Sequence, residues 1–149
     1  METVVLIGLQ ASGKSSFCRE YLFESHVRIN MDMLRTRYRE KLLIAACHEA
    51  KQPYVVDNTN PTRAERVGYI QAAKAAGFRV AGYYFASKVE DCKLRNSRRP
   101  ATKIVPLKGL LGTFSKLQLP EKEEGFDELH YVSIAEDGGF AVSVWSNEV

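Results

Sequence analysis

A glycine-rich loop near the N-terminus constrains the fold of this chain more than any other feature. The letters GLQASGKS at residues 8–15 match the pattern GxxxxGKS and follow a short apolar run at residues 3–7. In this pattern the glycines let backbone N–H groups turn inward around phosphates, and the next helix presents its positive N-terminal end to the same anion. The sequence therefore predicts a phosphate-binding loop (P-loop) between a buried strand and a helix.

Two side chains of the P-loop are suited to a nucleoside triphosphate and its metal ion. Lys14 is expected to reach the β- and γ-phosphates and to act in catalysis, and the Ser15 hydroxyl is suited to ligate Mg²⁺. The expected cofactors are therefore ATP and Mg²⁺. The residues of this loop expected to bind ATP are Gly8, Gln10, Ala11, Ser12, Gly13, Lys14, Ser15 and Ser16.

Strand-like and helix-like segments alternate after the P-loop. Such alternation favours βαβ crossovers, and hence a three-layer α/β/α fold with a mostly parallel sheet. A turn at residues 137–139 predicts a C-terminal hairpin strand. The predicted strands are residues 3–7, 27–30, 54–57, 78–85, 131–134 and 140–145, and the predicted helices are residues 14–23, 33–50, 60–77 (capped by Asn60), 89–97 and 107–117.

Composition is typical of one compact domain over residues 1–149, because 149 residues with 45% hydrophobic content can bury a core without disulfide bonds or structural metal ions. No apolar run approaches the roughly 20 residues of a membrane span, so no membrane partner is expected. Cys18, Cys47 and Cys92 are odd in number and match no zinc or redox spacing. Free thiols fit a reducing compartment, and we expect the cytoplasm.

A second motif, NMDMLR at residues 30–35, follows the predicted strand at residues 27–30. Asp32 is suited to accept the proton of a hydroxyl nucleophile, so we expect it to be catalytic. Arg35 is expected on the same helical face, where its guanidinium can hold a phosphate of the acceptor. The pattern also fits a helix cap at Asp32 with Arg35 in solvent. The P-loop favours the first interpretation.

A third motif, YVVDNTN at residues 54–60, is an apolar strand that ends in a carboxylate. This is the pattern of a Walker B element, so Asp57 is expected to hold Mg²⁺ together with Ser15, directly or through water. Asn58 or Thr59 is expected to bond to the acceptor or to loop carbonyls. Asn58 and Asn60 also fit a turn that does no more than cap the next helix.

A basic segment follows the predicted fourth α/β unit. Residues 93–120 hold seven basic residues and no acidic one, and the letters RNSRRP at residues 95–100 end a predicted helix at a proline. Phosphoryl transfer needs positive charge on the migrating group, so residues 95–106 are expected to form a lid over the nucleotide. Arg95 and Arg99 are the expected lid residues, although Arg98 fits as well. A solvated basic face is the alternative.

The motifs GLQASGKSS, NMDMLR, VVDNTNPTR and RNSRRPATKIVP occur in this order over residues 3–134 and resemble the kinase domain of polynucleotide 5′-kinases. They also resemble a broader group of small bacterial AAA-type ATP-binding proteins and predicted kinases. The resemblance implies the strand order 2-3-1-4-5. It further implies that Lys14 and Ser15 bind ATP and Mg²⁺, that Asp32 is the general base and Arg35 the acceptor-phosphate ligand. Its lid arginines, which engage ATP, correspond to Arg95 and Arg99.

Three functions fit these motifs. Transfer of the ATP γ-phosphate to the 5′-OH of DNA or RNA is the function that the resemblance implies, with a nucleic-acid 5′ end as partner. The same ATP machinery also fits a kinase of a small-molecule hydroxyl, such as a nucleoside, sugar or antibiotic. The third interpretation is an ATP-binding module that switches conformation and phosphorylates nothing.

Overall fold

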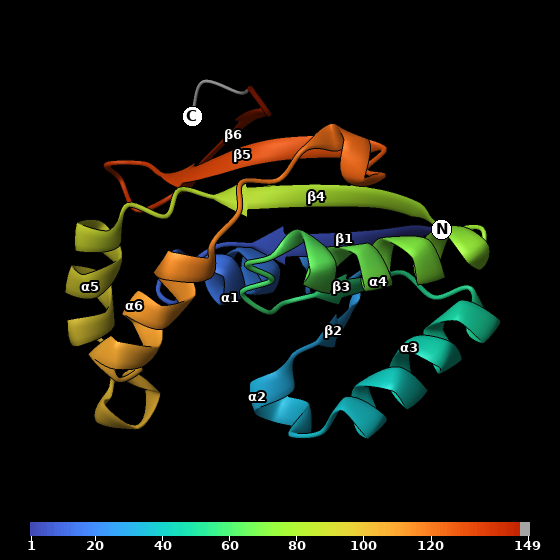
Figure 1. The fold of residues 1–149 in the computed structure, drawn as a ribbon, viewed down its shortest axis with the longest axis horizontal. Helices are drawn as coiled ribbons and strands as arrows, with labels where there is room; N and C mark the ends of the chain where they lie inside the picture. The colour runs from blue at the N-terminus through green and yellow to red at the C-terminus, as the bar shows by residue number, and fades with distance from the viewer. Residues whose placement is uncertain (147–149) are drawn as a thin grey trace.

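The computed structural model describes residues 1–146, and within them the strands form one six-stranded sheet in the order β2-β3-β1-β4-β5-β6 (Figure 1). Neighbouring strands from β2 to β5 are parallel, and β6 pairs antiparallel with β5. The predicted α/β class, strand order and C-terminal hairpin strand are therefore confirmed. The strands are β1 (Glu2–Ile7), β2 (Val27–Ile29), β3 (Tyr54–Val56), β4 (Arg79–Phe85), β5 (Glu128–Ile134) and β6 (Phe140–Val144).

Helices cover both faces of the sheet (Figure 1). None of those within residues 1–146 has the length and apolar character that crossing a membrane requires. They are α1 (Lys14–Phe17), which continues as the π-helical η1 (Cys18–Leu22), α2 (Met31–Leu34), α3 (Arg37–Ala50), α4 (Arg63–Ala75), α5 (Val89–Ser97) and α6 (Leu107–Lys116), with 3₁₀ turns η2 (Ala101–Lys103) and η3 (Lys122–Glu124).

The central strand β1 is buried on both sides. Its alternate side chains enter different core clusters: Val5 packs with Ile70 of α4, whereas Val4 packs with Phe17 of α1. Successive side chains of a strand point to opposite faces, so a strand covered on both sides has no polar face, and even Thr3 of β1 is fully buried. This explains why residues 3–7 lack the alternation of a half-exposed strand, and it places the P-loop at the end of a rigid element.

The single helix predicted over residues 33–50 is wrong. The backbone breaks at Arg35, whose φ is 73°, a value outside the range of a right-handed helix. The chain then begins α3 afresh, with Thr36 accepting a hydrogen bond from the Arg39 N–H at 3.2 Å. Asp32 lies before this break, so the helical face that it was expected to share with Arg35 does not form.

The predicted start of the next helix is also wrong. Thr62 caps α4 in a capping box with Glu65, and Asn60 lies outside the helix with a φ of 45°. The Asn60 side chain instead donates to the Leu6 carbonyl at 2.7 Å. Its role is therefore to join the loop after β3 to the end of β1.

A buried ion pair holds the first turns of α4. Arg66 is fully buried, and its guanidinium donates to both carboxylate oxygens of Glu124 at 2.8 and 3.1 Å. Its third bond goes to the Asn60 carbonyl at 2.9 Å. Arg66 thus connects α4, the segment before β5 and the loop after β3.

The substitution Arg66→Met is expected to lower the free energy of unfolding by about 2 kcal/mol, because the Glu124 carboxylate loses both guanidinium hydrogen bonds. It keeps the Glu121 N–H at 2.8 Å and the more distant Arg63 guanidinium at 3.9 Å. Urea denaturation followed by circular dichroism measures this change. The matched control Gln71→Met, on the exposed face of α4, should stay within about 0.5 kcal/mol of the wild type. Equal stability of the two variants would contradict the assigned role of Arg66.

Candidate active site

A cavity of about 380 Å³ lies beside the P-loop. Most of its lining comes from the segments that follow β1, β2 and β3, at the carboxyl ends of the strands, where open α/β sheets bind their ligands, and the rest comes from the segment after α5. Most of the residues singled out in the sequence therefore meet in one place. The lining residues are Gln10, Ala11, Gly13, Lys14, Ser15, Ser16, Asn30, Met31, Asp32, Arg37, Asp57, Asn58, Thr59, Arg99 and Val105.

Two glycines shape the P-loop. Gly8 and Gly13 have φ values of 156° and 104°, which residues with a side chain rarely adopt. A Cβ on Gly8 would also lie 3.2 Å from the Phe85 carbonyl oxygen and 2.9 Å from the Ser12 hydroxyl. The tight turn therefore requires glycine at both fixed positions of the pattern.

The Lys14 ammonium lies inside the loop. Its Nζ donates to the carbonyls of Gly8 at 2.8 Å and Leu9 at 2.6 Å, and the residue is 8% exposed. Burial lowers the pKa of Lys14 to about 8, because a desolvated amine holds its proton less firmly. A phosphate beside Nζ would have the opposite effect and favour the charged form.

The Asp57 carboxylate follows β3 and is almost completely buried. Its Oδ2 accepts from the Ser15 hydroxyl at 3.0 Å and from Arg28 Nε at 2.8 Å. A carboxylate and a hydroxyl are hard oxygen ligands, so the pair expected from the sequence to bind Mg²⁺ has the right chemistry and lies together. Arg28, in β2, was missed because no sequence motif marks it.

The turn that carries Asp32 is tied to the end of β3. Asn30 caps α2 by accepting from the Met33 N–H at 3.0 Å, and its amide donates to the Asp57 carbonyl at 2.6 Å. Asn58 accepts from the Met31 N–H at 3.0 Å. Asn30 is therefore the cap, and the Asp32 carboxylate is exposed on the cavity wall instead of closing the helix end.

Two arginines near this turn differ in their access to the cavity, and the one expected there is not the one found there. Arg35 is exposed and does not line the cavity, whereas Arg37, in the first turn of α3, does. Arg37 Nη1 donates to both oxygens of Glu40 at 3.1 Å and to the Tyr69 hydroxyl at 3.0 Å. Sequence reasoning missed Arg37 because its position depends on the break at Arg35.

The basic segment packs against the P-loop from the side of α5 and α6. Arg95 Nη1 donates to the Ala11 carbonyl at 3.3 Å, and Arg99 lines the cavity. Arg98 is exposed and lines no part of it. Gln10 of the loop donates to the Thr113 hydroxyl of α6 at 3.0 Å. The structure thereby separates three arginines that the sequence could not rank.

Known proteins resemble the chain in sequence. The AAA_33 family, described as an AAA domain, matches residues 36–117. A bifunctional polynucleotide phosphatase/kinase of Schizosaccharomyces pombe is 31% identical over 137 residues, which cover 88% of this chain and 33% of the relative. The chain thus spans about a third of that relative's length.

Solved structures resemble it in fold. A gluconokinase from Sinorhizobium meliloti 1021 has a TM-score of 0.65 at 19% identity, covering 91% of this chain and 83% of its own. The APS kinase of Mycobacterium tuberculosis, solved with AMPPNP and APS, has a TM-score of 0.53 at 20% identity, covering 80% of this chain and 83% of its own. The sheet order and the P-loop are those of the P-loop kinase fold that these neighbours share. The chain belongs to the AAA_33 family, whose match spans more than half of its length.

ATP binding is expected to weaken as the pH rises above about 8, where the buried Lys14 loses its proton. Because the phosphates favour only the charged amine, binding must then take up a proton, and the dissociation constant should rise toward about tenfold per pH unit. Isothermal titration calorimetry in buffers of different ionisation enthalpy measures both the dissociation constant of ATP and the number of protons taken up on binding.

The Lys14→Arg variant is the control, because its guanidinium stays charged over this range. Its affinity for ATP should not depend on pH. A wild-type dissociation constant that stays flat from about pH 7 to pH 9 would contradict the lowered pKa of Lys14.

Proposed function

We propose that this kinase transfers the γ-phosphate of ATP to the 5′-OH of a DNA or RNA strand. The observation that carries the proposal is the exposed Asp32 carboxylate, which lines the same cavity as Lys14 and Arg99. A proton acceptor and two phosphate-binding cations in one cavity are the groups that phosphoryl transfer to a hydroxyl requires. The relative named polynucleotide phosphatase/kinase supports a polynucleotide as acceptor.

Asp32 acts as the general base in this mechanism. Its carboxylate takes the proton of the 5′-OH as the hydroxyl oxygen attacks the γ-phosphorus and the bond to the β,γ-bridging oxygen breaks. Lys14 leaves the loop carbonyls for the phosphates, which hold a cation more strongly than neutral carbonyls do. Arg99 stabilises the charge that develops on the transferred group.

Ser15 and Asp57 are the residues that would hold Mg²⁺, since a hydroxyl and a buried carboxylate meet at 3.0 Å. The metal ion would neutralise charge on the β- and γ-phosphates. Arg28 pairs with the same Asp57 oxygen and would have to turn toward solvent or toward a phosphate when that oxygen ligates the ion.

The segment at residues 95–106 acts as the lid. Arg95 already contacts the P-loop through the Ala11 carbonyl, and Arg99 faces the cavity. Closure of this segment over the triphosphate would bring both guanidinium groups onto it and exclude water from the reaction.

In this proposal the acceptor binds on the side of Asp32 that faces away from the P-loop and the lid. Arg37 is our candidate for binding an acceptor phosphate, in place of Arg35, because Arg37 lines the cavity and Arg35 does not. Within residues 1–146, the hydrogen bonds of Arg37 all leave from Nη1, so Nε and Nη2 stay available for an anion. Asn58, beside it, is the second candidate for a contact with the acceptor.

Labelled γ-phosphate is expected to pass from ATP to 5′-OH oligonucleotides of DNA or RNA when Mg²⁺ is present. The Asp32→Asn substitution should lower kcat by a factor of about 10²–10⁴, because it removes the proton acceptor. It should leave the dissociation constant of ATP unchanged, because Asp32 is not a phosphate ligand. Rapid-quench transfer assays and calorimetry measure the two effects.

Asp91→Asn is the matched control, since Asp91 is an exposed carboxylate in α5 that lines no part of the cavity. It should transfer phosphate at the wild-type rate. Transfer by Asp32→Asn at that rate would remove Asp32 as the base. ATP binding without transfer to any oligonucleotide would refute the proposed acceptor.

A further inference from the structure

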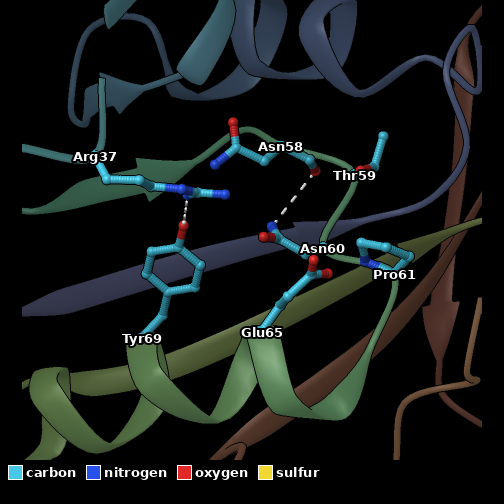
Figure 2. Close-up of a pocket in the computed structure, with 7 residues that line it drawn as sticks. All are labelled: Arg37, Asn58, Thr59, Asn60, Pro61, Glu65 and Tyr69. Carbon is cyan, nitrogen blue, oxygen red and sulfur yellow. Dashed lines mark hydrogen bonds between the residues drawn. The ribbon is translucent and has the colours of Figure 1, made fainter. Parts of the chain in front are cut away.

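A second, smaller cavity, drawn in Figure 2, shares part of its lining with the first. It measures about 150 Å³ and shares Arg37, Asn58 and Thr59 with the large cavity. Of the described residues, none from the P-loop lines it, so it lies away from the loop that is proposed to bind the triphosphate. The other lining residues are Asn60, Pro61, Glu65 and Tyr69.

We infer that this small cavity binds the base of the 5′-terminal nucleotide of the acceptor strand, an inference that rests on the proposed function. Pockets for whole drug-sized ligands measure about 300–1,000 Å³. A cavity of about 150 Å³ therefore suits one part of an acceptor, of the size of a single base.

The walls have the chemistry that bases recognise. Tyr69, from α4, and Pro61 supply apolar ring surfaces, while Asn58 and Glu65 supply polar groups around the same space (Figure 2). Proteins bind unpaired bases by stacking them on aromatic side chains and by hydrogen bonds to their edges. A phosphate fits the small cavity less well than a neutral base, because the Glu65 carboxylate lines it and would repel an anion.

The aromatic wall is held in one position. The Tyr69 hydroxyl donates to Glu40 at 3.0 Å and accepts from Arg37 at 3.0 Å, and Glu40 is only 7% exposed. Burial, together with the Glu40 carboxylate, raises the pKa of Tyr69 to about 12, so the phenol stays protonated and keeps both bonds. A ring that is fixed before binding loses little conformational entropy when a base stacks on it.

The cavity is also linked to the catalytic turn. The Asn58 Oδ1 accepts a hydrogen bond from the Met31 N–H at 3.0 Å. Met31 begins the α2 turn that carries Asp32. A base that contacts Asn58 would therefore be positioned relative to Asp32 through Asn58 and the adjoining Met31. The cavity would thus orient the terminal nucleotide so that its 5′-OH faces the general base.

The test compares oligonucleotides that differ only at the 5′-terminal residue, which carries either a base or an abasic sugar with the same 5′-OH. Wild type should have a kcat/KM about tenfold higher for the strand with the base, at the lower end of what one stacked base contributes. The Tyr69→Leu substitution should reduce this ratio to about one, and Tyr69→Phe, which keeps the ring, should retain it.

Two controls make the result specific. Tyr38→Leu replaces a tyrosine of α3 that is 72% exposed and lines neither cavity, so it should keep the wild-type ratio. An abasic site at the third nucleotide should not change kcat/KM, because the small cavity holds one base. Calorimetric ATP binding confirms that each variant is folded.

The outcomes separate this inference from the proposed function. Equal kcat/KM for base and abasic termini in the wild type, with transfer intact, overturns the base site and leaves the 5′-kinase. Retention of the tenfold ratio in a folded Tyr69→Leu variant likewise overturns the role of the small cavity. Absence of transfer to every oligonucleotide overturns the proposed function and this inference together.

Discussion

Two hydrogen bonds between the P-loop strand and the loop after β3 determine the geometry of the whole site. The Asn60 amide donates to the Leu6 carbonyl at 2.7 Å, and the Gly8 N–H donates to the Thr59 carbonyl at 3.0 Å. They hold the loop after β3 against the end of β1, so the Asp57 carboxylate lies beside Ser15. The positive φ of Asn60 is the conformational strain that this arrangement requires.

The site also concentrates charge where little water reaches it. Lys14, Asp57 and Glu40 are all less than a tenth exposed, and each is hydrogen-bonded: Lys14 donates to carbonyls of the P-loop, and the two carboxylates accept from neighbouring side chains. Buried charges of this kind add little net stability, but fixed dipoles and charges in a dry cavity act strongly on a transferred phosphate. The cost in stability is offset elsewhere, in the apolar clusters on both faces of β1.

The sequence predicted the parts of the molecule that depend on local pattern. The apolar run before the P-loop and the glycines within it allow only one backbone conformation, so β1 and the P-loop turn were predicted correctly. The break at Arg35 and the hydrogen bond from Asn60 to Leu6 were not predicted. The α2 turn before the break is held to the end of β3 by Asn30 and Asn58, and such contacts between distant segments leave no local sequence pattern. The same is true of Arg37, which enters the cavity only because α3 begins after that break.

The most direct measurement of the central claim is a crystal structure of the protein with AMPPNP, Mg²⁺ and a short 5′-OH oligonucleotide. The account predicts the 5′-OH within about 2.6–3.2 Å of the Asp32 carboxylate. It predicts also that Lys14 Nζ and Arg99 contact the γ-phosphate. A 5′ end bound away from Asp32, or a hydroxyl held by a different base, would contradict it.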